Sequence, residues 1–237
     1  MTTFVLIHGA WHGGWCWEKL APLLEARGHR VVAPDLPGHG ADRTPLAQIT
    51  LDAYAERVRA TVAAQPEPVV LVGHSMGGVV ITAGAERIPE RIRTLVYLTA
   101  FLVGPGESLS SAAGNDPDSL LAGNLALAPD GLSIEVKPDF VKPAFYAQCS
   151  DTDAERARAR LAPQATSIFT APVRYTPERA GRIPRVYIEC TRDRAIGLPV
   201  QRRMAAARPC AKVLTLDTDH SPFYSTPEAL AAHLAGL

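Results

Sequence analysis

The sequence predicts an α/β fold: a mostly parallel, doubly wound sheet flanked by helices, with a lid inserted into it. Short apolar runs alternate with segments of helical period up to about residue 103, and the alternation resumes near residue 184. Such alternation is typical of a parallel sheet with right-handed crossovers. It is absent between residues 104 and 183, a stretch too long to be an ordinary loop. We therefore expect a core of residues 1–103 and 184–237 with an inserted cap of residues 104–183.

The composition narrows the classes of partner and compartment. The 237 residues include 24 Lys and Arg against 24 Asp and Glu, so nothing indicates nucleic acid or a membrane as partner. The N-terminus lacks signal-peptide features and no apolar run could cross a bilayer, so we expect a cytoplasmic protein. The four cysteines are scattered without the spacing of a zinc site, so we expect free thiols and neither a metal nor another cofactor. The expected partner is a small molecule, and a homodimer is left open.

The first half of the chain supplies four expected strands. Phe4–Ile7 is an apolar run that suits a strand of a parallel sheet, and 31–33 is the second strand. A helix over 17–24 lies between them, and Gly28 is expected to end it in a left-handed conformation. Strands at 69–72 and 93–99 follow. The helix before them shows an apolar face formed by Leu51, Tyr54, Ala55, Val58 and Val62.

The second half begins with the expected lid. It holds many prolines and glycines but also large apolar residues, which argue against a disordered linker, and a helical stretch at about 152–161. The sheet resumes at 185–190, a crossover helix covers 198–208, and the last strand is 213–216. Thr226 is the expected N-cap of the final helix, with Pro227 at its first position.

A serine stands at a sharp turn after the third strand. The residues Gly73-His74-Ser75-Met76-Gly77 follow four apolar strand-formers and precede a helical segment. This G-x-S-x-G pattern is typical of a nucleophilic serine held between a strand and a helix, where the glycines allow the backbone to bend. Ser75 is therefore the candidate nucleophile.

A serine hydroxyl needs a base, and the base needs an acid that orients it. In this architecture both should follow the last strands, in the chain order serine, acid, histidine. The loop after 185–190 contains Asp193, and the loop after 213–216 contains His220. We expect these two to serve as acid and base, with Asp217 and Asp219 as competing acids.

The developing oxyanion needs two backbone N–H donors. Met76, which follows the nucleophile, supplies one, and Ala10 in the loop after the first strand is expected to supply the other. His8, His12, His39 and His74 also lie in strand-end loops, where we expect structural hydrogen bonds.

Four motifs stand in the order found in one superfamily: His8-Gly9-Ala10-Trp11-His12-Gly13-Gly14-Trp15-Cys16-Trp17, Asp35-Leu36-Pro37-Gly38-His39-Gly40, Gly73-His74-Ser75-Met76-Gly77-Gly78 and Thr191-Arg192-Asp193-Arg194-Ala195-Ile196. With them the chain resembles the α/β-hydrolase superfamily, in the branch of plant methylesterases, plant hydroxynitrile lyases, bacterial carboxylesterases and pyrethroid hydrolases. The resemblance extends to the lid segment from Phe145 to Asp151. It implies Ser75, Asp193 and His220 as the triad, and Ala10 and Met76 as the oxyanion donors.

The resemblance also separates two chemistries. Lyases of this branch carry a threonine after the first-strand histidine and a lysine after the catalytic histidine. Here these positions hold Gly9 and Ser221, so no cation is available for a leaving cyanide. We expect hydrolysis of small, largely apolar carboxylic esters through an acyl-enzyme on Ser75.

Other functions stay open on the same residues. They are thioester, lactone, amide or C–C hydrolysis, a lyase reaction, and a ligand-sensing protein with vestigial catalysis. A dehalogenase or an epoxide hydrolase is excluded because either would need a carboxylate where Ser75 stands. Insertions and strand-end loops form the pockets of such sheets. Candidate pocket residues are Trp11, Phe101, Leu102, Phe140, Phe145, Tyr146, Phe169 and Phe223.

Overall fold

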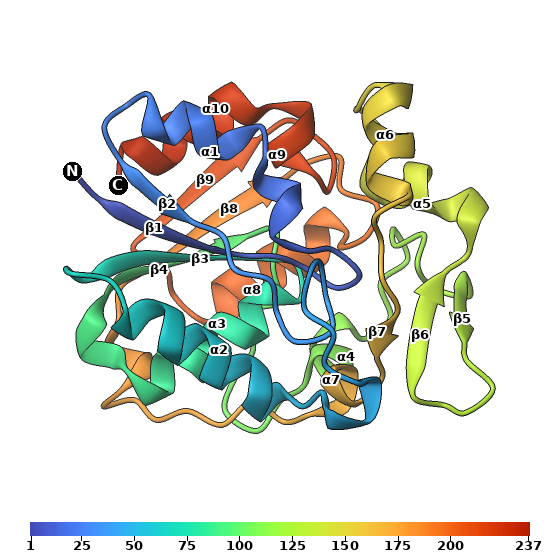
Figure 1. The fold of residues 1–237 in the computed structure, drawn as a ribbon, viewed down its shortest axis with the longest axis horizontal. Coiled ribbons are helices and arrows are strands. Elements are labelled where there is room, and N and C mark those ends of the chain that lie inside the picture. Colours follow the sequence, from blue (N-terminus) through green and yellow to red (C-terminus); the bar gives the residue numbers. More distant parts are fainter.

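The computed structural model describes residues 1–237, and a six-stranded parallel sheet lies at its centre (Figure 1). Every neighbouring pair of its strands is parallel. In spatial order the strands are β2 (Arg30–Val32), β1 (Thr3–Ile7), β3 (Val69–His74), β4 (Ile92–Leu98), β8 (Arg185–Cys190) and β9 (Lys212–Leu216). All six expected strands are therefore present, and the predicted fold class is confirmed.

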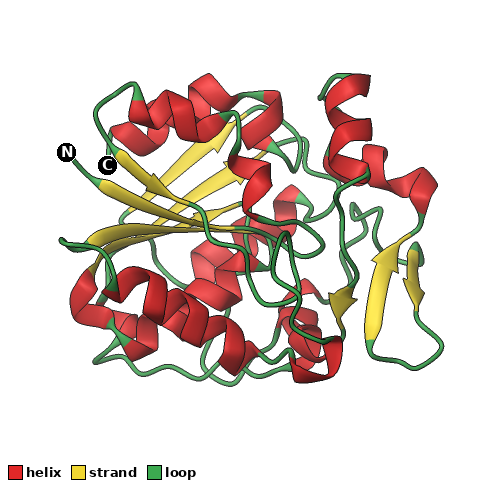
Figure 2. Ribbon diagram, in the orientation of Figure 1, coloured by secondary structure: helices red, strands yellow, loops and turns green.

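Helices cover both faces of this sheet (Figure 2). On one face α1 (Leu20–Glu25) packs against α10 (Pro227–Ala235), and on the other α2 (Leu51–Ala63) packs against α3 (Gly77–Arg87). The central strands β1 and β3 are buried along their whole length, as expected for a sheet covered twice. The remaining helices of this part are α8 (Leu198–Ala207), α9 (Pro222–Ser225) and the 3₁₀ turns η1 (Gly14–Trp17), η2 (Leu46–Gln48) and η3 (Pro89–Arg91). A fourth 3₁₀ turn, η4 (Ala180–Arg182), lies near the end of the segment between β4 and β8.

The spacing of apolar residues in the sequence correctly predicted which face of α2 is buried. All five residues of its expected apolar face are buried, and Thr50 caps the helix by accepting a hydrogen bond from the Ala53 N–H at 3.1 Å. The cap fixes where the helix begins, and its apolar face fixes how the helix lies on the sheet.

One expectation about where a helix begins was wrong. The helix expected over 17–24 begins only at Leu20, because Pro22 has no N–H and fits just the first turn, while Gly14–Trp17 form the separate turn η1. Thr226 is the N-cap residue of α10 and Pro227 its first residue, as expected, although the buried Thr226 hydroxyl makes no capping hydrogen bond. Gly28 does adopt the expected left-handed conformation, with φ 78°.

The chain between β4 and β8 adds no strand to the main sheet. Residues 104–183, called the inserted segment below, instead contain a small antiparallel sheet in the order β5-β6-β7, at the right of Figure 1. These short strands were not expected from the sequence. The division into core and cap domains stays a prediction. The inserted segment contains α4 (Leu109–Ala113), β5 (Leu125–Leu127), β6 (Ser133–Val136), α5 (Pro138–Phe145), α6 (Asp151–Arg158), β7 (Gln164–Ala165) and α7 (Ser167–Thr170).

The strand order reverses direction at β1, which lies between β2 and β3. In such sheets the carboxyl ends of the strands beside this switch point leave room for a ligand. The loops after β1 and β3 therefore meet where a site is expected. None of the helices has both the length and the apolar character needed to cross a membrane.

Candidate active site

Ser75 occupies the turn between β3 and α3 with a left-handed backbone conformation, φ 53°. Glycines make this turn possible. A Cβ at position 73 would lie 2.5 Å from the Gly77 carbonyl oxygen, and one at position 77 would lie 2.7 Å from the Ile7 carbonyl oxygen. A non-glycine residue pays roughly 1–2 kcal/mol for a left-handed conformation. The fold therefore holds this serine in a strained turn at the carboxyl end of the sheet.

Asp193 and His220 lie together in the buried interior. The Nδ1–H of His220 donates to Oδ2 of Asp193 at 2.6 Å, and both side chains are nearly inaccessible. They come from the loops after β8 and β9, which are neighbouring parallel strands. The hydrogen bond fixes the proton of His220 on Nδ1 and leaves Nε2 as a free base. No hydrogen bond joins His220 to Ser75 in this structure, as is common for catalytic groups without a substrate.

Further donors hold the Asp193 carboxylate in place. Oδ1 accepts from the backbone N–H groups of Ala195 at 2.6 Å and Ile196 at 2.8 Å. Oδ2 accepts a second hydrogen bond from the hydroxyl of Thr99, which follows β4 and has φ 36°. Sequence reasoning missed Thr99. The available signal was a polar residue at the carboxyl end of a strand next to the one preceding Asp193.

The two competing acids lie elsewhere. Asp217 is exposed and paired with the Arg192 guanidinium, which donates from Nε at 2.8 Å. Asp219 is buried and accepts from the backbone N–H groups of Gln148 at 2.7 Å and Ser221 at 3.1 Å and from the Ser225 hydroxyl at 2.9 Å. Neither carboxylate contacts the His220 ring nitrogens, so Asp193 is the acid that the structure brings to His220.

His74, the residue before Ser75, hydrogen-bonds to the loop that carries His220. The Nε2–H of His74 donates to the backbone carbonyl of His220 at 2.8 Å, and the two ring centroids lie 4.5 Å apart. Burial lowers the pKa of His74 well below its ordinary value, so this ring is neutral. His74 thus connects the Ser75 turn to the loop that carries His220.

The other loop histidines make structural hydrogen bonds, as expected. Nδ1–H of His8 donates to the Gly9 carbonyl at 2.8 Å, and Nδ1–H of His12 donates to the Ala10 carbonyl at 2.7 Å. His39 contacts the Tyr54 hydroxyl at 3.1 Å. Burial lowers the pKa of both His12 and His39 to about 4.

Two backbone amides beside Ser75 have no partner in the protein. Neither the Ala10 N–H nor the Met76 N–H donates a hydrogen bond to another group, although both residues are buried. Both line the cavity that contains Ser75. A pair of preorganised, unpartnered N–H donors beside a nucleophile is the arrangement that stabilises an oxyanion.

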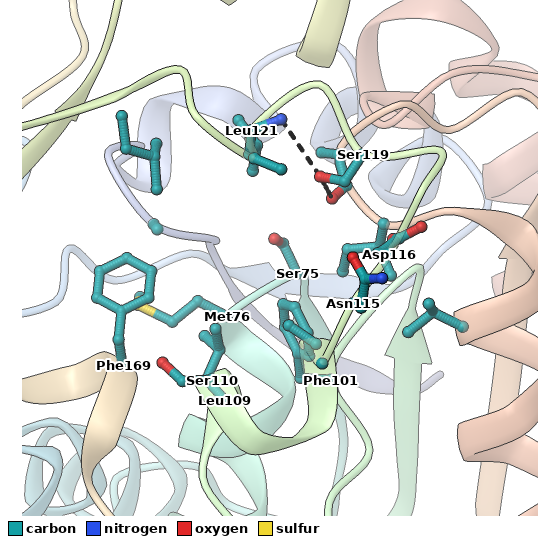
Figure 3. A pocket seen from close by; sticks show the side chains of 18 of the residues that line it. Ser75, Met76, Phe101, Leu109, Ser110, Asn115, Asp116, Ser119, Leu121 and Phe169 are labelled. Carbon is teal, nitrogen blue, oxygen red and sulfur yellow. Dashed lines mark hydrogen bonds between the residues drawn. The ribbon is translucent and has the colours of Figure 1, made fainter.

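The cavity has a volume of about 330 Å³, and the Ser75 side chain points into it (Figure 3). Its wall contains no Lys or Arg, and Asp116 is its only charged residue. The Asp116 carboxylate accepts from the backbone N–H groups of Gly197 at 2.7 Å and Asp118 at 3.1 Å. Most of the wall is apolar, so the cavity suits an uncharged, largely apolar ligand.

Three of the eight expected pocket residues line this cavity: Trp11, Phe101 and Phe169. The others do not. Phe145 packs against the His220 ring at 5.5 Å between centroids, the Tyr146 hydroxyl bonds to Nε2 of His12 at 2.5 Å, and Phe223 packs against Trp17 at 5.0 Å. Leu102 is buried in the hydrophobic core, and the half-buried Phe140 packs against that core.

Aliphatic side chains, rather than these aromatic ones, form much of the cavity wall. The missed lining residues include Leu109, Ala113, Leu121, Leu125, Ile196 and Val200. Four of these six belong to the inserted segment. Leu109 and Ala113 lie in α4 and Leu125 in β5, and both elements are too short for a period in the sequence to mark which residues face inward.

The structure contains no group of three or more His, Cys, Asp or Glu side chains placed to hold a metal ion. All four cysteines are free, as expected; Cys16 and Cys190 are buried and Cys149 and Cys210 half-buried.

A model of the alpha/beta hydrolase family matches residues 4–233. The chain is 36% identical over 243 residues to Methylesterase 1 of Arabidopsis thaliana, covering 96% of this chain and 92% of that protein. It is 32% identical to an alpha-hydroxynitrile lyase of the same plant, covering 99% and 96%. The crystal structure of a pyrethroid hydrolase from Sphingobium faniae JZ-2 superposes with a TM-score of 0.89 at 32% identity, covering 99% of this chain and 96% of that one.

Proposed function

Because this chain belongs to the alpha/beta hydrolase family, we propose that it is a serine carboxylesterase that hydrolyses small, largely apolar esters. Similarity to a methylesterase and to a pyrethroid hydrolase supports ester hydrolysis. The observation that carries the assignment of residues is the buried hydrogen bond of 2.6 Å between His220 and Asp193, at the sheet edge where Ser75 stands in its strained turn.

In the first step the Ser75 Oγ attacks the ester carbonyl carbon, and the free Nε2 of His220 takes the hydroxyl proton. The positive charge that this creates on the imidazole is offset by the Asp193 carboxylate, whose position depends on Ala195, Ile196 and Thr99. His220 then returns the proton to the alkoxy oxygen. The alcohol leaves, and the acyl group stays on Ser75.

The carbonyl oxygen becomes negative as its carbon turns tetrahedral. The N–H groups of Ala10 and Met76 are available to stabilise this charge, since neither is engaged elsewhere. Removing one such donor typically costs about 3–4 kcal/mol in the transition state. In the second half of the reaction His220 takes a proton from a water molecule, whose oxygen attacks the acyl carbon. His220 then returns the proton to the Ser75 Oγ as the acid leaves.

The cavity supports the choice of substrate class. Its 330 Å³ accommodates a small ester, and its wall offers no cation that would attract a carboxylate-bearing substrate. The single carboxylate of Asp116 disfavours an anionic one further.

The threonine and the lysine that hydroxynitrile lyases of this branch carry are both absent from this chain. A Cβ at position 9 would lie 2.9 Å from both His74 Nδ1 and Ser75 Cβ, so the threonine found in such lyases would not fit without a shift. The Ser221 hydroxyl, at the position of their lysine, is neutral and has no hydrogen-bond partner.

The test is Ser75→Ala, assayed with p-nitrophenyl acetate and with a fluorophosphonate probe that labels only a competent nucleophile. Turnover and labelling should both disappear in this variant. Ser110→Ala is the matched control, because it removes another serine hydroxyl from the same cavity and should still be labelled. Undiminished turnover in Ser75→Ala would contradict the mechanism, and a wild-type protein that is never labelled would favour a ligand-sensing role.

A further inference from the structure

A second cavity of about 260 Å³ has one lining residue in common with the cavity that contains Ser75, and that residue is Trp11. The second cavity is formed by the inserted segment. Its remaining wall residues are Glu135, Val136, Pro138, Val141, Arg158, Leu161, Ala162 and Pro163.

Trp11 is hydrogen-bonded to the inserted segment and packs against it. Its indole N–H donates to the Ile134 carbonyl in β6 at 2.8 Å, and its own carbonyl accepts from the Ala162 N–H at 2.9 Å. The indole packs against Phe145 and Phe169, with centroids 5.6 and 6.0 Å away. These contacts hold the residue in a left-handed conformation, φ 64°, which a tryptophan adopts only under such constraint.

We propose that the second cavity is a latent subsite for the far end of the ester, and that Trp11 is the specificity-determining partition that closes it off. This inference rests on the proposed esterase function and adds to it the length of substrate that the site accepts. With Trp11 in place the substrate is confined to the cavity of Ser75. Without the indole the two cavities become one continuous space.

The walls of the second cavity indicate what would enter it. Val136 and Val141 are buried, whereas the charged Glu135 and Arg158 are exposed. An apolar chain fits between the aliphatic side chains, and its end would reach the charged residues near solvent. A longer ester of an aliphatic acid or alcohol is therefore the class of substrate expected.

The test compares wild type with Trp11→Gly, since glycine removes the indole and also adopts a positive φ without strain. We measure kcat/KM along two ester series, one lengthening the acyl chain from acetate to decanoate and the other lengthening the alcohol. The expected result is a rise of about tenfold or more in the long-to-short ratio of kcat/KM in one series. Using this ratio cancels any loss that affects all substrates equally, which matters because Trp11 follows Ala10.

A second substitution separates entry into the second cavity from a simple gain of room. Trp11→Gly combined with Ala162→Phe fills that cavity while keeping the indole absent, so the ratio should return toward the wild-type value. Phe101→Ala enlarges the cavity of Ser75 at a ring that does not pack against Trp11, and it serves as the comparison. In this variant the further change Ala162→Phe should leave the ratio unaltered. Trp11→Leu is the milder variant if glycine prevents folding, as judged by circular dichroism.

An unchanged ratio in folded Trp11→Gly or Trp11→Leu would overturn the inference. So would a raised ratio that Ala162→Phe fails to reduce. Neither result touches the proposed esterase function, which fails if Ser75→Ala retains turnover or if the fluorophosphonate probe never labels the wild-type protein.

Discussion

The residues proposed to carry out the chemistry and the residues that enclose the substrate are held in different ways. Asp193 and His220 are buried at the edge of the parallel sheet, and hydrogen bonds from loops after β4, β8 and β9 fix their side chains. The cavity wall within the inserted segment consists of half-buried side chains such as Leu121 and Leu125. Hydrogen bonds thus fix the positions of Asp193 and His220, whereas apolar packing forms much of the cavity wall, which is hydrogen-bonded to the core at Asp116 and Ser119.

This difference predicts how each region tolerates substitution. A hydrogen bond to a charged group is directional, and losing it leaves a buried group without its partner. A half-buried aliphatic side chain loses only part of its transfer free energy when shortened. Substitutions at the sheet edge should therefore affect turnover strongly, whereas substitutions in the inserted segment should change substrate preference.

The largest effect is expected from Asp193→Asn. The amide cannot hold His220 in the tautomer that leaves Nε2 as a base, so kcat should fall by about 10⁴-fold. Steady-state kinetics with p-nitrophenyl acetate measures this. Asp217→Asn is the matched control, because Asp217 is exposed and paired only with Thr191 and Arg192, in the loop after β8. Equal losses in the two variants would show that the buried acid has no special role.

Acid should destabilise the fold through its buried histidines, none of which lies in the inserted segment. Burial lowers the pKa of His12 and His39 from 6.5 to about 4 in the folded state, so the unfolded chain binds more protons between those values. Stability is therefore present above pH 6.5 and is lost as the pH falls toward 4. Each residue should contribute roughly 2 kcal/mol of loss between pH 6.5 and 5.

Urea denaturation across this pH range measures the free energy of unfolding directly. In His39→Gln the free energy of unfolding should fall by roughly 2 kcal/mol less over this pH range than in the wild type, because one of the two histidines is absent. A free energy of unfolding that stays constant between pH 7 and 5 would contradict the neutral state of these histidines.

An intermediate effect is expected from Thr99→Val, which keeps the shape of the side chain and removes the hydroxyl that donates to Asp193. A hydrogen bond to a charged group is worth about 1.5–3 kcal/mol, so kcat should fall by roughly 10- to 100-fold with KM little changed. Thr99→Ser restores the donor and should recover most of the activity. If serine and valine behave alike, the hydroxyl is not what positions Asp193.

The smallest effect is expected from Leu125→Ala in β5. Leu125 lines the cavity of Ser75, so the variant should raise KM by a few-fold for the bulkier esters and leave kcat for acetate esters nearly unchanged. Leu127→Ala is the control two residues along the same strand, since Leu127 is 62% exposed and lies outside the cavity wall. A large fall in kcat in Leu125→Ala would mean that the two regions are not separable.

The same contrast explains what the sequence could and could not predict. The strands were predictable because each is a short apolar run, and Asp193 and His220 because their loops follow strands in a fixed order. Thr99 was not, because its role depends on β4 lying beside β8, which is a property of the folded sheet. Phe145 and Phe223 were assigned to the pocket because an apolar ring signals burial but not whether it faces a cavity or another ring.

The buried carboxylate of Asp219 has a practical consequence for protein engineering. It accepts from the backbone N–H of Gln148, in the connection between α5 and α6, and it lies next to His220 in the chain, while Phe145 packs against the His220 ring. Changes in the backbone path of this connection, or in the Phe145 side chain, should therefore disturb the histidine. The stretch from residue 113 to 125 has no such tie to His220 and supplies much of the cavity wall. Within this stretch Asp116 and Ser119 hydrogen-bond to Gly197 and Ala195, in the loop that carries Asp193. A library that randomises the stretch but keeps these two residues, and spares residues 145–150, should therefore yield altered substrate ranges with a high fraction of active clones.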